Sequence, residues 1–179
     1  MVCRNKDAQS QCKITMKCYC VLDCKVLDQI QYEVLNYLKH NTILLTEKRQ
    51  RYKAWATANT KEVIRNCPSI IKWLRTLKIL PTEISFIVYQ EIGVGLPIHT
   101  DDPRLISKIN VPIQHTEGNI TRWHDADDQV IAEYNMEKPV VFNSSIPHSV
   151  EIINTNLPRV VMVIMCNNEK RLLEFLQDE

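Results

Sequence analysis

The spacing of apolar residues divides the chain into a helical first part and a strand-rich second part. A short strand is predicted around Met16–Leu22, and apolar residues then recur at three- and four-residue steps over Leu27–Leu38, which predicts a helix ending near His40. A second helix is predicted from Pro68, because proline suits the first turn of a helix. Its apolar stripe would be Ile70, Leu74 and Leu77.

From Pro81 onward the pattern changes to short β-type runs separated by turn residues. A terminal helix is predicted at Asn168–Leu176, with Leu172, Leu173 and Leu176 turned inward. The predicted strands are Ile84–Ile92, Ile98–Asp101, Lys108–Ile113, Ile120–His124, Val130–Tyr134, Val140–Asn143, Ser149–Ile153 and Val160–Cys166. So many strands are enough to close a barrel or jelly roll, and the lack of β–α alternation argues against a doubly wound parallel sheet.

The length of 179 residues and the composition favour a single folded domain. With 45% apolar and 24% charged residues, the chain has the composition of an ordinary globular protein. We expect an α+β, mainly β, architecture in which residues 1–80 form a helical support region, residues 81–167 form the jelly-roll core and residues 168–179 form a C-terminal helix.

Net charge gives no electrostatic argument for a nucleic-acid or membrane partner, because 22 Lys and Arg residues stand against 21 Asp and Glu residues. The first seven residues precede no apolar signal-peptide segment, and no apolar run is long enough to span a bilayer. These features predict a cytoplasmic protein with no membrane partner and no strong nucleic-acid signal.

Seven cysteines raise the possibility of a zinc site or disulfides. Their spacing lacks the paired Cys-x-x-Cys knuckles of zinc sites, and Cys18 and Cys20 alternate with their neighbours as strand residues do. We therefore expect reduced, structural thiols. Five of them lie in the first 24 residues: Cys3, Cys12, Cys18, Cys20 and Cys24.

Candidate chemistry lies within the strand-rich part. His99 and Asp101 are two residues apart, which on a strand directs both side chains to one face. His148, at the mouth of a later strand, offers a third ligand. Two imidazoles and one carboxylate form a facial triad that leaves coordination positions open and suits non-heme iron(II).

A His-x-Asp pair alone is weak evidence, and the ordered set of residues around it carries the hypothesis. A glycine-containing loop, Gly93–Gly95, precedes His99, and Arg159 follows His148 at the start of the last strand. Arg159 offers a planar, permanently charged fork that matches a carboxylate bidentately. A keto acid that chelates iron needs such a cation for its distal carboxylate.

The stretch Ile84–Cys166 resembles the iron(II)- and 2-oxoglutarate-dependent oxygenases of double-stranded β-helix (jelly-roll, cupin-like) fold, with aspartyl/asparaginyl β-hydroxylase-like and prolyl-hydroxylase-like proteins the most similar groups. This chain departs from the β-hydroxylase group in two ways. The group tends to lack the carboxylate ligand that Asp101 provides here. The group also has an Arg-x-His pair where this chain has Lys108 and Asn110, and a serine where this chain has Val88. The matching residues are Gly93, His99–Asp101, Lys108–Pro112, Phe142–Val150 and Pro158–Val161.

The resemblance implies an oxygenase that hydroxylates a C–H bond with O₂ and 2-oxoglutarate, releasing succinate and CO₂. By this resemblance His99, Asp101 and His148 would bind iron(II), and Arg159 would anchor 2-oxoglutarate. Lys108 could serve an anion of the co-substrate and Asn110 could donate a hydrogen bond to it. The substrate stays open between a protein side chain, a free amino acid, a nucleobase and a small metabolite.

Other interpretations of these residues compete with the oxygenase. His115 or His124 could replace a proposed ligand, but neither has a carboxylate two positions away on a matching face. A non-catalytic cupin-like protein that binds a metal or small ligand has no reason to combine an iron triad with Arg159. A metal-dependent isomerase or epimerase would supply more protein ligands. Core or surface roles are favoured for Arg122, Trp123, Asp102 and the basic run Lys48–Arg51.

Overall fold

The computed structural model describes residues 17–41, 53–89, 95–101, 106–153, 156–166 and 169–177. In chain order its elements are β1 (Tyr19–Val21), α1 (Leu27–His40), β2 (Lys53–Ala58), α3 (Thr60–Asn66), α4 (Pro68–Thr76), β3 (Pro81–Tyr89), β4 (Leu96–His99), β5 (Ser107–Gln114), β6 (Ile120–His124), β7 (Val130–Asn135), β8 (Val140–Asn143), β9 (His148–Glu151), β10 (Arg159–Cys166) and α5 (Glu169–Leu176).

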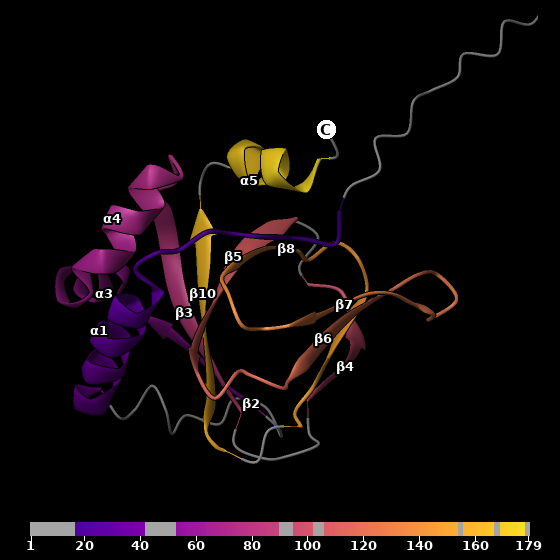
Figure 1. Ribbon diagram of the computed structural model, residues 1–179, viewed down its shortest axis with the longest axis horizontal. Coiled ribbons are helices and arrows are strands. Elements are labelled where there is room, and N and C mark those ends of the chain that lie inside the picture. The colour runs from indigo at the N-terminus through magenta and orange to yellow at the C-terminus, as the bar shows by residue number, and fades with distance from the viewer. Residues whose placement is uncertain are drawn as a thin grey trace, which may run out of the picture.

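Two antiparallel sheets form a jelly roll, as the sequence predicted. The larger sheet has six strands in the order β1-β8-β5-β10-β3-β2, and the smaller has four in the order β4-β9-β6-β7. Helices α1, α3 and α4 lie along one side of the large sheet, while the small sheet lies on its other side (Figure 1). The described elements therefore form a helical layer, a large sheet and a small sheet.

Strand β10 shows why the large sheet is buried on both faces. Val160, Met162 and Ile164 belong to the core cluster that contains the helix residues, while Val161 and Val163 belong to the cluster between the sheets. Because successive strand side chains point to opposite faces, one apolar run serves two cores. Arg159 lies two residues before Val161 on the same strand, so its side chain points to the same side, toward the space between the sheets.

The helical layer confirms the apolar stripes predicted from the sequence. Ile30, Val34 and Leu38 of α1 are buried, as are Ile70 and Leu74 of α4. Burial of each such side chain stabilises the fold by about 1.5–3 kcal/mol. In α5, Leu172 and Leu176 are buried and Leu173 packs partly against the same cluster. No described helix has the length and apolar character needed to cross a membrane.

All eight strands predicted after Pro81 are present; β6 and β8 have the predicted ends, and the other six are shifted at one or both ends. Strand β4 ends at His99 and not at Asp101, and His148 and Arg159 each begin a strand. The structure also contains β2 and α3, which the sequence did not predict. Strand β2 pairs with β3 along its length. For α3 a start signal was present, since the Asn59 side chain accepts hydrogen bonds from the backbone N–H groups of Lys61 and Glu62.

The five described cysteines are all free thiols, as expected. Burial raises the pKa of Cys67 and of Cys166 to about 12, so both are protonated and inert as nucleophiles at neutral pH. Cys3 and Cys12 lie outside the described residues. Cys67 lies in the apolar core cluster, and Cys20, Cys24 and Cys166 pack partly against it, so these thiols act as small apolar side chains.

Helix α4 begins with a capping interaction from another helix. Its own N-cap residue, Cys67, makes no side-chain cap bond. Instead the backbone N–H and the hydroxyl of Ser69 donate to the Glu33 carboxylate of α1, over 3.0 and 2.8 Å. Partial burial raises the pKa of Glu33, but the hydrogen bonds from Gln29 and Ser69 outweigh it and hold the pKa below its ordinary value of 4.5. Glu33 thus fixes α4 against α1.

Replacing Glu33 by Gln should lower the free energy of unfolding at neutral pH by about 1 kcal/mol, since a charged cap is lost. Because the folded-state pKa is depressed, the contribution of Glu33 is complete above its unfolded pKa and disappears as pH falls through the folded pKa. Urea unfolding of wild type and Glu33→Gln on both sides of pH 4.5 measures this. Asp127→Asn, on the exposed β6–β7 turn, is the control, and a pH-independent difference would contradict the prediction.

Candidate functional site

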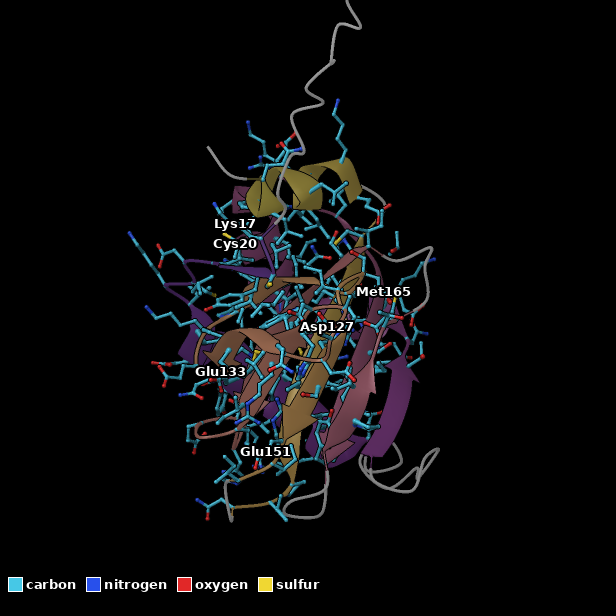
Figure 2. All side chains as sticks on the ribbon, turned by 90° about the vertical axis from the view of Figure 1, so that its right-hand side faces the viewer. Lys17, Cys20, Asp127, Glu133, Glu151 and Met165 are labelled. Atoms are coloured by element: carbon cyan, nitrogen blue, oxygen red, sulfur yellow. The ribbon has the colours of Figure 1, made fainter. Side chains whose placement is uncertain are left out.

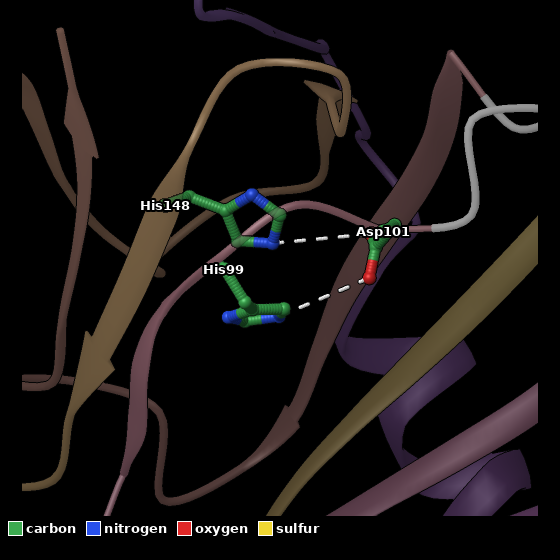
Figure 3. A group of neighbouring side chains, drawn as sticks. All are labelled: His99, Asp101 and His148. Atoms are coloured by element: carbon green, nitrogen blue, oxygen red, sulfur yellow. Dashed lines mark ion pairs between the residues drawn. The ribbon is translucent and has the colours of Figure 1, made fainter. Parts of the chain in front are cut away.

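Strand pairing brings the three candidate metal ligands together. His99 ends β4 and lies directly opposite His148 in the antiparallel pair of β4 with β9. Asp101 follows two residues later, where its backbone N–H donates to the Ser144 carbonyl over 3.2 Å. The three side chains converge on one point between the sheets (Figure 3). They form the one group of metal-ligand side chains found among the described residues.

The distances in this group suit a single ion. His99 Nε2 lies 3.9 Å from Asp101 Oδ1, and His148 Nε2 lies 3.9 Å from Asp101 Oδ2. All candidate ligand atoms are within 4.8 Å of one another. Two metal–ligand bonds of about 2.1 Å span up to about 4.2 Å. A small closure of the three side chains would therefore let one cation contact all of them.

Both histidines are oriented by the same local contact. His99 Nδ1 lies 2.8 Å from the Pro97 carbonyl oxygen, and His148 Nδ1 lies 2.9 Å from that of Ile146. A carbonyl oxygen can only accept, so Nδ1 of each ring carries the proton and donates. Each Nε2 then presents its lone pair to the centre, which is the arrangement that backbone carbonyls impose on metal-binding histidines.

The environment keeps these groups in the protonation states that bind cations. Burial lowers the pKa of His148 to about 4, with Lys108 and His99 adding to the effect. Burial alone would raise the pKa of Asp101, but the adjacent Lys108 ammonium outweighs it and lowers the pKa below the ordinary range. At neutral pH His148 is therefore a neutral imidazole and Asp101 a carboxylate.

Lys108 lies beside the triad on the inner face of β5. Its ammonium forms an ion pair with Asp101 Oδ2 and lies 5.0 Å from the centre of the Phe142 ring. Lys108 and Phe142 are directly opposite each other in the pairing of β5 with β8. Only 8% of the Lys108 side chain is exposed. The sheet thus holds a buried cation against the candidate ligand Asp101.

Arg159 reaches the same cavity from the start of β10. It is 2% exposed, its guanidinium lies 4.9 Å from the Tyr89 ring centre, and its Nε has no hydrogen-bond partner. No ion pair joins it to an acidic residue in the part of the chain that is described. Burial raises the pKa of Tyr89 to about 12, so the phenol is neutral and leaves the charge of Arg159 uncompensated.

Asn110 completes the polar lining of this cavity. It lies two residues after Lys108 on the same face of β5, is 7% exposed, and its Oδ1 has no partner. All six candidate residues from the sequence therefore line one cavity. Its lining is Ile87, Tyr89, Leu96, His99, Asp101, Lys108, Asn110, Thr121, Met136, Phe142, His148, Val150, Arg159 and Val161.

The alternative histidines do not take part. His124 has both ring nitrogens in hydrogen-bond contacts, with Ser149 Oγ at 2.9 Å and the Asp128 carbonyl at 3.2 Å. His115, at a turn with φ 50°, lines a different cavity between α1 and the start of β10. Neither lines the cavity of the triad. Asp102, Lys48–Arg51 and Gly93–Val94 lie outside the described residues.

Trp123 and Arg122 lie on opposite faces of the small sheet. Trp123 is fully buried, packs on Phe142, and lies opposite His148 in the pairing of β6 with β9. Arg122 pairs with Glu133 at 3.0 Å and with Glu151 at 2.5 Å. Figure 2 labels these two glutamates, which lie on the outer face of the small sheet. Core or surface roles were expected for each of these residues; Trp123 packs in the core and Arg122 lies in surface ion pairs.

Two contacts were not foreseen from the sequence. Phe142 packs edge-on against His148, with ring centres 4.8 Å apart, and Tyr89 stacks under Arg159. Both residues stand within apolar strand runs, so the sequence carries no signal that separates them from ordinary core aromatics. Gly95 has a clearer reason: a Cβ there would lie 1.5 Å from the Val150 carbonyl oxygen, so only glycine lets the chain before β4 approach β9.

No family model and no curated protein matches this sequence. Solved structures do match its fold. A prolyl hydroxylase from Trichoplax adhaerens, in complex with a peptide of the hypoxia inducible factor oxygen degradation domain, aligns with a TM-score of 0.59 and 15% identity over 87% of this chain and 86% of that one.

Two further structures align with a TM-score of 0.50. A prolyl-4-hydroxylase from Pseudomonas putida has 17% identity over 84% of this chain and 92% of its own. AviO1 from Streptomyces viridochromogenes Tue57 has 11% identity over 84% of this chain and 89% of its own. At such identities the comparison establishes the fold: the chain has the jelly-roll fold of prolyl hydroxylases.

In the metal-free protein, His148 should stay neutral well below the ordinary histidine pKa of 6.5, because burial lowers its pKa to about 4. Its ¹⁵N ring shifts should report a proton on Nδ1 and none on Nε2 from neutral pH down to about pH 5. The resonance is assigned by its absence in His148→Gln. A titration of His148 near pH 6.5 would contradict the buried, neutral ring.

Proposed function

We propose that this protein is an iron(II)- and 2-oxoglutarate-dependent oxygenase that hydroxylates a C–H bond. One observation carries the proposal: a buried arginine that has no acidic partner among the described residues, Arg159, lines the same cavity as the His99, Asp101 and His148 triad. The triad alone would suit several divalent cations. Arg159 adds a site for a carboxylate at a distance from the metal, as a bound keto acid requires.

The donor set fits iron(II). Two neutral imidazole nitrogens and one carboxylate form the facial triad of non-heme iron oxygenases, in which three neighbouring coordination positions stay open. His99 and His148 present Nε2 because their Nδ1 atoms are hydrogen-bonded to backbone carbonyls. No further His, Cys, Asp or Glu joins the group in the described chain, so open positions would remain for the co-substrate and O₂.

The polar lining also fits 2-oxoglutarate. Arg159 would hold the distal carboxylate, and its partnerless Nε is a donor that such a ligand satisfies. The Asn110 amide, which donates through its nitrogen, would assist it, and Lys108 would add positive charge near the metal-bound end. These assignments for Lys108 and Asn110 come from the cavity they share with Arg159.

The protein's own residues would orient the reactants and exclude water. With iron bound, 2-oxoglutarate and O₂ supply an oxidative decarboxylation that yields succinate, CO₂ and a hydroxylated substrate. His99, Asp101 and His148 hold the metal, and Arg159 fixes one end of the co-substrate. Apolar side chains, including Leu96, Val150 and Val161, keep the cavity wall dry.

The prolyl hydroxylase neighbours, one of them in complex with a peptide, support a hydroxylase and make a protein side chain a natural first candidate substrate. Free amino acids, nucleobases and small metabolites are the other candidate substrates. The proposed enzyme is one domain over residues 1–179, and its cytoplasmic location stays a prediction.

A second candidate function is a non-catalytic cupin-like binding protein. The ion pair between Lys108 and Asp101 favours it, because a carboxylate neutralised by lysine is a weaker metal ligand. Arg159 argues against it, since a buried cation without an acidic partner destabilises a barrel that binds no anion. Metal and co-substrate binding separate the two candidates.

Substitutions should separate metal binding from co-substrate binding. Asp101→Ala should abolish binding of Mn²⁺, a redox-stable substitute for iron(II), because one of three ligands is lost. Arg159→Ala should retain Mn²⁺ but weaken 2-oxoglutarate on the order of a hundredfold, with Arg159→Lys intermediate. Isothermal titration calorimetry measures both, with Lys61→Met as the surface control. Equal metal retention in all variants would refute the triad.

The purified protein should convert 2-oxoglutarate to succinate when supplied with iron(II), O₂ and ascorbate, slowly without its true substrate. Quantifying succinate by mass spectrometry tests this, with His99→Ala as the inactive control. Cell extract treated in the same way should contain a molecule that gains one oxygen atom. Absence of both turnover and anaerobic 2-oxoglutarate binding would refute the oxygenase.

A further inference from the structure

The three candidate ligands are not held in the same way. His99 and His148 are each oriented by a backbone carbonyl two residues earlier in the chain. Asp101 has its backbone N–H bound to the Ser144 carbonyl, and among the described residues the hydrogen-bonding partner of its carboxylate is the Lys108 ammonium. The rotation of the Asp101 carboxylate is therefore set by Lys108.

The two oxygens of Asp101 have different surroundings. Oδ2 is in the ion pair with Lys108 and lies 3.9 Å from His148 Nε2, while Oδ1 lies 3.9 Å from His99 Nε2. An oxygen that already accepts from a buried ammonium is a poor second donor to a cation, because two positive charges would share it. Oδ1 is thus the oxygen available to a metal.

Lys108 has strong reasons to remain where it is. The sheet register sets it opposite Phe142, whose ring takes the other side of the ammonium at 5.0 Å. The residue is only 6% exposed, and Asp101 is its only ion-pair partner among the described residues. If Lys108 moved away from Asp101, its ammonium would be a buried charge without that ion-pair partner, which is strongly unfavourable.

We propose that Lys108 is a positioning residue that keeps Asp101 a one-oxygen metal ligand. By occupying Oδ2 it prevents the carboxylate from chelating the metal with both oxygens. The protein then supplies three donor atoms, and three coordination positions stay open. A keto acid needs two of them and O₂ the third. This inference rests on the proposed function and assigns Lys108 a task apart from direct contact with the co-substrate.

Cobalt(II) provides a direct probe of this task. Water fills the positions that the protein leaves open, so the pulsed EPR spectrum of the cobalt protein in ¹⁷O-enriched water, without 2-oxoglutarate, reports how many positions the protein's own donors occupy. Lys108→Met should release Oδ2, add one protein donor and weaken the ¹⁷O signal, because one bound water is displaced. Lys108→Arg should keep the wild-type spectrum because it retains a cation on Oδ2. Lys61→Met is the matched surface control.

Co-substrate binding should change in a related way. The cobalt form of Lys108→Met should bind 2-oxoglutarate on the order of tenfold more weakly than wild type, since one open position is lost. Its affinity for cobalt itself should not fall, because the Asp101 carboxylate gains an oxygen contact and loses a neighbouring cation. Lys108→Arg should restore 2-oxoglutarate binding.

The outcomes separate this inference from the proposed function. Failure of wild-type protein to bind cobalt would refute the metal site itself. An unchanged cobalt spectrum in Lys108→Met, with weaker 2-oxoglutarate binding, would assign Lys108 to the co-substrate directly and overturn the positioning role. A crystal structure of the wild-type cobalt complex tests the same point without any variant: Lys108 should remain on Oδ2, and a lysine turned away from Asp101 would overturn the proposal.

Discussion

The register between β4 and β9 is the constraint on which the candidate site depends. It sets His99 directly opposite His148, and the pairing of β6 with β9 sets Trp123 opposite the same histidine. A slip of β4 by one residue against β9 would turn His99 to the other face of the sheet, away from His148, because side chains alternate along a strand. Gly95 permits this register, since any side chain there would collide with the Val150 carbonyl. The chemistry of the site thus begins with a backbone approach that only glycine allows.

The large sheet supplies the remaining polar groups without weakening its core. On β5, Ile109 and Val111 pack in the cluster that contains the helix residues, while Lys108 and Asn110 point into the cavity between the sheets. The helical layer therefore stabilises strands whose other face carries buried polar groups at an energetic cost. Strand β10 has the same arrangement: Val160 and Met162 belong to the core on the helix side, and Arg159 points to the other face. Stability and function are divided between the two faces of the same strands.

Much of this arrangement was predictable, because strand alternation and a His-x-Asp spacing are local signals. The strands after Pro81 and helices α1, α4 and α5 agree with the sequence analysis. The six candidate residues line one cavity, and their roles stay predictions. Strand β2 was missed because it depends on pairing with β3, a contact distant in sequence. The Lys108–Asp101 ion pair and the Arg159–Tyr89 contact could not be predicted either, since each joins side chains of different segments that come together only in the folded protein. The sequence did not show which residue each charged side chain of the site contacts.

In the proposed oxygenase, the charges that line the cavity would make metal binding and co-substrate binding depend on one another. Lys108 and Arg159 are cations and Asp101 is an anion, which leaves one positive charge in excess within a largely apolar wall. A divalent metal alone would deepen that excess, and a low-dielectric interior makes uncompensated charge expensive. A dicarboxylate brings the opposite charge, with Arg159 at one end and the metal at the other. Binding of one is therefore favoured by the other through electrostatics as well as through direct coordination. On this proposal Arg159, which has no acidic partner among the described residues, lies where the anion would bind.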